Sequence, residues 1–197
     1  MGKELDFFTI GNSFGGNQSW MTDPWMHLGG CGALTACDTC IYLARHRGQR
    51  QLYPFDAHNL KKSDYMKFSK IMKPFLRPRA SGINTLKIYI DGFTDYLETR
   101  NETLEMTGFD GSEPVAHAIE VVKKQIDAGL PIACLTLNHR NPAYKDYVWH
   151  WFLLVGYEEA EDVFKVKIAT YGEYIWEDFR GLWDTGFEEK GGLVLYK

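Results

Sequence analysis

The sequence has no long hydrophobic run. Its longest uncharged apolar stretch, Val148 to Tyr157, is interrupted by His150 and is far shorter than the roughly 20 residues that a membrane-spanning helix needs. The amino terminus carries acidic residues where a signal peptide would have a basic and then an apolar segment. We therefore expect a cytoplasmic protein with no membrane partner.

Basic charge is also scarce. The 22 Lys and Arg residues are outnumbered by 26 Asp and Glu residues, which gives a net charge of −4. Nucleic acids and anionic lipids are usually bound through a basic surface, so the sequence predicts neither as a partner. The segment Gly11 to Gly16 lacks the spacing and the lysine of a phosphate-binding loop, so nucleotide binding has no support.

Linkers, repeats and low-complexity tracts are missing as well. The 197 residues therefore predict one domain spanning 1–197, because typical domains have roughly 100–200 residues. Aromatic residues are abundant, at 15% of the chain, and can build a large core without metal ions or disulfides. In a reducing compartment the four cysteines are expected to be thiols, catalysts or metal ligands before they are disulfides.

The hydrophobic pattern predicts helices first and strands afterwards. Residues 11–30 lack periodicity and are predicted to form an ordered loop. Apolar residues at helical spacing predict a first helix that starts beside Gly29-Gly30 and ends near Gly48. Further helices are predicted at 63–73, with Ser63 as cap and Pro74 as stop, at 83–97, and at 112–129, opened by Ser112 and Pro114. Strands are predicted at 131–137, 148–157, 163–170 and 192–196, with the middle two joined as a hairpin by a turn of about five residues. This order indicates an α+β fold.

Cys31 is the first candidate for chemistry. It lies between a glycine turn and the first turn of a predicted helix, in Gly29-Gly30-Cys31-Gly32. Unpaired backbone N–H groups and the helix dipole at such a position stabilise a thiolate, so we expect a lowered pKa for Cys31. The glycines leave room for a substrate backbone. Packing at a helix start is the alternative explanation.

His150 is a polar ring within the apolar strand predicted at 148–157. It can be a core histidine bonded to a carbonyl, or the base of a thiolate–imidazolium pair with Cys31. If Tyr157 and Val163 flank the hairpin turn, Thr170 lies directly across from His150 and can orient the imidazole. Glu173 has more suitable chemistry for that role, at a less certain position.

Other cysteine chemistry has weaker support. The segment Cys37-Asp38-Thr39-Cys40 matches a redox motif, but it falls on the apolar stripe of a helix, which favours core packing. Zinc binding by His27, Cys31, Cys37 and Cys40 has suitable residue types at an unusual spacing.

Two features near His150 are interpreted structurally. Trp149 and Trp151 should alternate away from His150 into the core. The polar segment Asn138 to Asp146, with His139, is expected to be a solvated loop, or else to overhang a substrate cleft.

These motifs together resemble those of papain-like cysteine peptidases. The resemblance rests on Gln18, on Gly30-Cys31-Gly32 opening a helix, and on His150 in a strand that ends Val-Gly-Tyr and is followed by a strand and Tyr171-Gly172. Within the family the chain is similar to the bacteriocin-processing (double-glycine) peptidase-like branch and its uncharacterised bacterial members. The matching motifs cover short stretches only, although their order agrees throughout.

The resemblance implies a papain-like core of N-terminal helices packed on a C-terminal antiparallel sheet. It places the nucleophile on Cys31, the general base on His150 and the oxyanion-hole amide on Gln18, with Asn17 as an alternative donor. The family's third-position Asn or Asp falls near Thr170.

The resemblance further implies thiol-dependent hydrolysis or transfer at an amide bond in a peptide or small amide substrate, with no cofactor and no metal. Threonine at the third position favours one alternative, a non-catalytic peptide- or partner-binding module on the same scaffold. A second alternative is a small-molecule acyltransferase or amidase.

Overall fold

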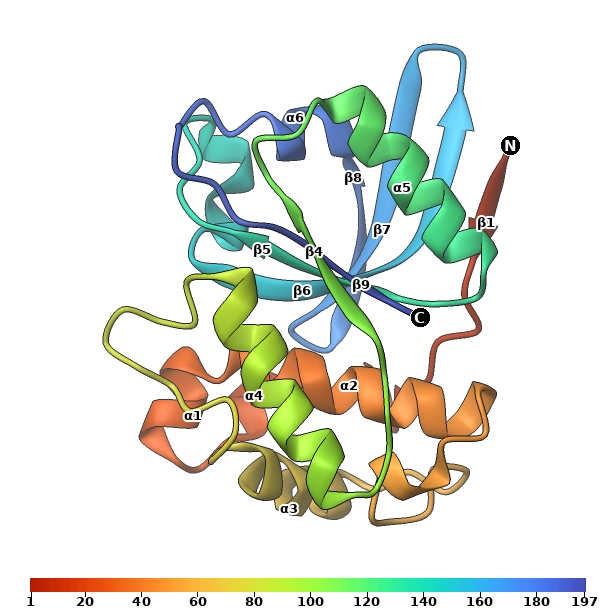
Figure 1. Ribbon diagram of the computed structural model, residues 1–197, viewed down its shortest axis with the longest axis vertical. Coiled ribbons are helices and arrows are strands. Elements are labelled where there is room, and N and C mark those ends of the chain that lie inside the picture. The colour runs from red at the N-terminus through yellow and green to blue at the C-terminus, as the bar shows by residue number, and fades with distance from the viewer.

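The computed structural model describes residues 1–197 and has an α+β architecture (Figure 1). Its helices are α1 (Pro24–Gly29), α2 (Cys31–His46), α3 (Lys62–Met72), α4 (Leu86–Thr99), α5 (Val115–Asp127) and α6 (Phe179–Trp183), with short 3₁₀ segments η1 (Gln18–Trp20), η2 (Arg50–Leu52) and η3 (Pro142–Tyr147). Its strands are β1 (Gly2–Glu4), β2 (Thr9–Ile10), β3 (Ser13–Phe14), β4 (Met106–Asp110), β5 (Ile132–Thr136), β6 (His150–Ala160), β7 (Val163–Thr170), β8 (Glu173–Asp178) and β9 (Gly192–Tyr196).

An antiparallel sheet of seven strands forms the centre of the molecule. Its order is β4-β9-β5-β6-β7-β8, and β1 pairs with the far end of β6. Helices α1 to α4 lie on one side of this sheet and α5 and α6 on the other (Figure 1). None of the helices has the length and apolarity that crossing a bilayer requires.

Helix α2 is fixed by burial in the hydrophobic core. Twelve of its residues are buried, so the helix is apolar on nearly every side and packs between α3 and β6. On the opposite side of the sheet, α5 buries a single stripe of Ala118, Ile119, Val122 and Ile126, as its amphipathic pattern predicts. Buried hydrophobic residues from all these layers form one cluster.

The structure corrects several predicted boundaries. Residues 11–30 are not loop throughout, because Asp23 caps α1 by accepting hydrogen bonds from the N–H groups of Trp25 and Met26. A helix of six residues is too short to show periodicity. Ser63 is not a cap: α3 starts at Lys62 after Lys61, and neither it nor α5 has a side-chain cap.

The predicted hairpin of β6 and β7 is present, with a different register. Ala160 pairs with Val163, so the turn has two residues instead of about five. A bulge between Leu154 and Gly156 then shifts the pairing, and Ala169 lies opposite Leu153. Strand β6 also begins at His150 and not at Val148. Sequence patterns did not predict β1, β4 or β8, which bury few of their side chains.

Candidate active site

Cys31 is the first residue of α2, and only Gly30 separates it from α1. Gly30 makes this abrupt junction possible, since a Cβ atom there would lie 2.4 Å from the carbonyl oxygen of Met26. Of the four free cysteines only Cys31 is partly exposed, while Cys37, Cys40 and Cys134 are buried. Burial of Cys37 and Cys40 confirms that this motif packs in the core, as its position on the apolar stripe of the helix predicted.

The pKa of the Cys31 thiol is raised above its ordinary value. Burial of the sulfur is the largest cause, and it outweighs the opposing effect of hydrogen bonding from the backbone N–H groups of Trp151, Gly32 and Cys31 itself. The expected lowering of the Cys31 pKa is therefore wrong. The helix start supplies N–H groups, but no charged neighbour adds to them, so Cys31 is a neutral thiol at neutral pH.

His150 begins β6 and is buried, with 5% of its surface exposed. Its Nε2 atom lies 2.6 Å from Oγ1 of Thr170. Burial lowers the pKa of His150 to about 4, so the imidazole is neutral at neutral pH. Threonine can hydrogen-bond to the ring but carries no negative charge to favour the imidazolium.

The contact between His150 and Thr170 occurs even though the predicted register is wrong. The pairing of Ala169 with Leu153 shifts Thr170 by two residues from its predicted place. Side chains alternate with a period of two along a strand, so a shift of two residues keeps Thr170 on the same face as before. The two side chains meet diagonally.

Glu173, the other candidate for orienting His150, does not reach it. It is the first residue of β8, pairs with Thr170 across a tight turn, and is exposed. The backbone turns away at this point, and the Glu173 side chain makes no hydrogen bond.

Gln18 lines a cleft of about 290 Å³ together with Cys31, His150 and Tyr171. Its Nε2 atom donates a hydrogen bond to the carbonyl oxygen of His27, at 2.8 Å, which fixes the amide against α1. Asn17 has a different role, since its side chain accepts a hydrogen bond from Ser19 N–H and caps η1. Asn17 does not line the cleft.

Cys31 and His150 line the same cleft, but no hydrogen bond joins the thiol to the imidazole. Both groups are neutral, so there is little electrostatic attraction to draw them into an ion pair. Cys31 and His150 are therefore a neutral thiol and a neutral imidazole, and not the predicted thiolate–imidazolium pair.

Two aromatic residues on either side of the site have strained backbones. Trp149 has φ +52° and Tyr171 has φ +53°. A residue other than glycine loses on the order of 1 kcal/mol of conformational free energy at such a φ. Trp149 is 48% exposed and lines the cleft, so its predicted core position is wrong. Its positive φ turns the backbone just before β6 begins at His150, so the alternation of the strand does not extend back to Trp149. Trp151 is buried as predicted and stacks on Tyr89.

Tyr171 covers His150. The two rings are parallel within 2°, with centroids 4.5 Å apart. Tyr171 and Gly172 both have positive φ and form the two-residue turn between β7 and β8. A tyrosine followed by glycine at a predicted strand end was the available sequence signal, but it gave no indication of the stacking.

Asp38 is a further polar group that the motifs did not identify. It lies two helical turns after Cys31, and its carboxylate accepts hydrogen bonds from the Tyr65 hydroxyl, at 2.7 Å, and from Gly16 N–H. Burial raises its pKa to about 7. The loop approaches so closely that a Cβ atom on Gly16 would lie 1.9 Å from the Tyr65 hydroxyl oxygen. Asp38 therefore ties the segment that carries Gln18 to α2.

The remaining predicted features lie elsewhere. The polar segment 138–146 contains η3 and is held by His139, whose Nε2 lies 3.0 Å from the Gly181 carbonyl oxygen. No three His, Cys, Asp or Glu side chains lie close enough together to hold a metal ion, so the alternative zinc set is not assembled.

Comparisons with known proteins give no match. No family model matches the sequence, and no curated protein is significantly similar to it. The function is accordingly inferred from the residues and geometry of the cleft.

Removing the Tyr171 ring should raise the pKa of His150. In Tyr171→Ala the imidazole gains access to water, and the pKa is expected to rise from about 4 toward its ordinary value of about 6.5. The measurement is an NMR titration of the His150 ring protons. Tyr171→Phe keeps the stacked ring and should leave the pKa where it is. An unchanged pKa in the alanine variant would show that Tyr171 does not desolvate His150.

Proposed function

We propose that the protein is a thiol-dependent amide hydrolase or transferase acting on a peptide or small amide, with a papain-like arrangement of Cys31 and His150. One observation carries the proposal. A partly exposed cysteine at a helix start and a buried histidine line one cleft, and Thr170 occupies the histidine nitrogen Nε2. Single-domain organisation and a cytoplasmic location belong to the same proposal.

The neutral state of His150 suits it to act as a general base. Thr170 occupies Nε2, so Nδ1 is the atom left to take the thiol proton. As a substrate carbonyl enters, the proton moves from Cys31 to Nδ1 and the sulfur–carbon bond forms. The imidazolium then protonates the leaving amine as the amide bond breaks. Water, or another acceptor, cleaves the thioester and regenerates the thiol.

Donors for the developing oxyanion are available at the same place. The backbone N–H groups of Cys31 and Gly32 already face the sulfur. The amide of Gln18 uses one N–H for the His27 carbonyl and has a second one free to donate. Fixed donors of this kind stabilise a tetrahedral intermediate without reorganisation.

A binding module without turnover is the second candidate. It is favoured by the missing hydrogen bond between Cys31 and His150 and by the neutral form of both groups. In that case the cleft holds a peptide, and Cys31 and His150 serve as lining side chains.

Alkylation separates the two candidates. We expect a peptidyl chloromethyl ketone, whose carbonyl must be attacked first, to modify Cys31 before the three buried cysteines. In His150→Gln this modification should slow about 10²-fold, the lower end of what a general base contributes. Mass spectrometry of peptide fragments identifies the labelled residue.

Iodoacetamide is the control reagent, because it needs the thiolate but no carbonyl activation. Its reaction with Cys31 should rise with pH beyond the ordinary cysteine pKa of about 8.5 and should change little in His150→Gln. If the ketone reacts equally well with and without His150, or labels all four cysteines alike, the hydrolase proposal fails and the binding module is favoured.

A further inference from the structure

A second recess, of about 540 Å³, lies between the start of α1 and the segment that joins α3 to α4. Its lining includes Trp25, Lys73, Pro74, Arg77, Pro78 and Arg79. It shares no lining residue with the Cys31 cleft, and none of its residues was a candidate site residue in the sequence. Trp25 is 59% exposed, which is a large apolar surface to leave in water.

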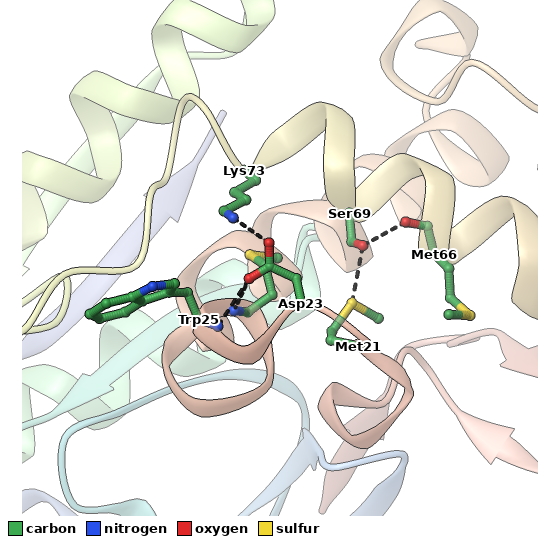
Figure 2. A network of polar contacts seen from close by, with 7 residues as sticks. Met21, Asp23, Trp25, Met66, Ser69 and Lys73 are labelled. Carbon is green, nitrogen blue, oxygen red and sulfur yellow. Dashed lines mark hydrogen bonds and ion pairs between the residues drawn. The ribbon is translucent and has the colours of Figure 1, made fainter.

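The charge of the recess is opposite to that of the protein. Lys73 pairs with Asp23, as Figure 2 shows, and Asp23 also caps α1 through Trp25 N–H. Arg77 and Arg79 are exposed and form no ion pair and no side-chain hydrogen bond. Two free guanidinium groups therefore gather in one place on a chain whose net charge is −4.

The walls of the recess are well anchored. Next to the Asp23–Lys73 pair, the Ser69 hydroxyl contacts the Met66 carbonyl oxygen and the Met21 sulfur (Figure 2). Pro78 is buried between the two arginines and packs close to Gly29, where a Cβ atom would lie 3.4 Å from it. Pro78 fixes the backbone between Arg77 and Arg79, which reduces the entropy lost when a ligand binds.

Helix α1 connects the recess to the Cys31 cleft. Trp25, near its start, lines the recess, while Leu28 and Gly29, at its end, line the cleft. At ~1.5 Å per residue the helix is about 9 Å long. Extended peptide covers that distance with about three residues, at ~3.3 Å each.

We propose that this recess binds an acidic segment of the peptide substrate, about three residues away from the amide that Cys31 attacks. Carboxylates would pair with Arg77 and Arg79, whose planar groups can bind them with two hydrogen bonds each. The aliphatic part of the segment would cover Trp25. That the bound peptide is a substrate rests on the proposed function, whereas acidic-peptide binding does not.

Peptide is favoured over nucleic acid or free phosphate by the surroundings of the recess. Two free cations on an acidic chain are too few for a polyanion backbone, which depends on many phosphate contacts. The exposed indole and the prolines offer apolar contact to a peptide chain but nothing to a small inorganic anion.

Fluorescence anisotropy tests the proposal. The probe is a fluorescein-labelled peptide with four consecutive glutamates, and the protein is the full chain carrying Cys31→Ala so that no turnover occurs. Adding Arg77→Gln and Arg79→Gln should weaken binding about tenfold, because two exposed ion pairs, each of them weak, are lost together. The matched control, Lys124→Gln with Arg180→Gln, removes two exposed cations from α5 and α6 and should change binding less than twofold.

Each other outcome is decisive. The proposal is overturned if the acidic peptide does not bind, if its glutamine counterpart binds equally well, or if the control variant loses as much affinity as the arginine variant. It is also overturned if inorganic phosphate or a single-stranded oligonucleotide displaces the peptide as efficiently as unlabelled peptide does.

Failure of the proposed function would look different. If Cys31 proves unreactive toward the chloromethyl ketone while the acidic peptide still binds through Arg77 and Arg79, the hydrolase proposal fails and the recess keeps its ligand. If Cys31 reacts and the arginine variant binds normally, the recess proposal alone fails.

Discussion

Cys31→Ala should reduce peptide hydrolysis at least about 10³-fold, to the background rate, without changing the unfolding midpoint. Cys31 is the only partly exposed thiol, and removing its sulfur leaves no other nucleophilic cysteine in the cleft. The assay uses quenched fluorescent peptides that contain an acidic segment, and urea unfolding followed by tryptophan fluorescence checks the fold.

Two further variants show whether His150 and Thr170 act in the same reaction. His150→Gln should cost about as much as Cys31→Ala, because residues that act as a unit give effects that do not add. Thr170→Val keeps the shape of the side chain and removes the hydrogen bond to Nε2, so it should lower kcat by about 10- to 10²-fold and leave KM nearly unchanged.

The result that contradicts this assignment is specific. If Cys31→Ala retains most of the hydrolysis, the activity resides elsewhere or in a contaminant. If Thr170→Val raises KM with kcat unchanged, Thr170 contacts substrate and does not position His150.

Periodicity predicted the elements with large buried stripes and missed the others. Helix α2 and strands β5, β7 and β9 bury most of their inward residues, so their apolar spacing was readable. Strands β1 and β8 bury little, and α1 depends on one aspartate cap before a proline. Such elements form because neighbouring strands offer hydrogen bonds or because a local cap does, and neither leaves a hydrophobic pattern.

The candidate site shows the same division. Residue types and order identified Cys31, His150 and Thr170, because helix starts and strand faces are local features, whereas Gln18 was identified by the family resemblance alone. Cys31, His150 and Gln18 line one cleft, and Thr170 contacts His150. The pKa directions could not be predicted, since they depend on how deeply the fold buries each group. The role of Asp38 was missed because the sequence shows it only as a residue between Cys37 and Cys40. Its partners, Tyr65 and Gly16, are brought to it by the fold.

Burial disfavours the charged forms of both His150 and Asp38, and these charged forms have opposite signs. The pH dependence of the free energy of unfolding is therefore the sharpest test of the site. His150 has a folded pKa of about 4 against about 6.5 when unfolded. The unfolded chain binds the proton more readily between these values, so stability contributed by neutral His150 is present above pH 6.5 and is lost as the pH falls toward 4. A tenfold difference in proton affinity between the folded and unfolded states corresponds to about 1.4 kcal/mol, so the whole effect is about 3 kcal/mol.

Asp38 acts in the opposite direction over nearly the same pH range. Its folded pKa of about 7 lies above the unfolded value of about 3.9, so the folded chain binds the proton more readily. Stability from protonated Asp38 is present below pH 4 and is lost as the pH rises toward 7, by up to about 4 kcal/mol. In the natural protein the two effects largely cancel between pH 4 and 7.

Single substitutions should expose each effect. In Asp38→Asn, which keeps an oxygen to accept from Tyr65 and Gly16, stability should rise by about 3 kcal/mol between pH 4 and 6.5, because only His150 still titrates there. In His150→Gln, stability should fall by up to about 4 kcal/mol between pH 4 and 7. Urea unfolding at several pH values measures both, and the exposed carboxylates contribute equally to every variant and so drop out of the comparison. Parallel pH profiles for the natural protein and both variants would mean that neither group titrates abnormally, and that burial does not keep His150 neutral between pH 4 and 6.5.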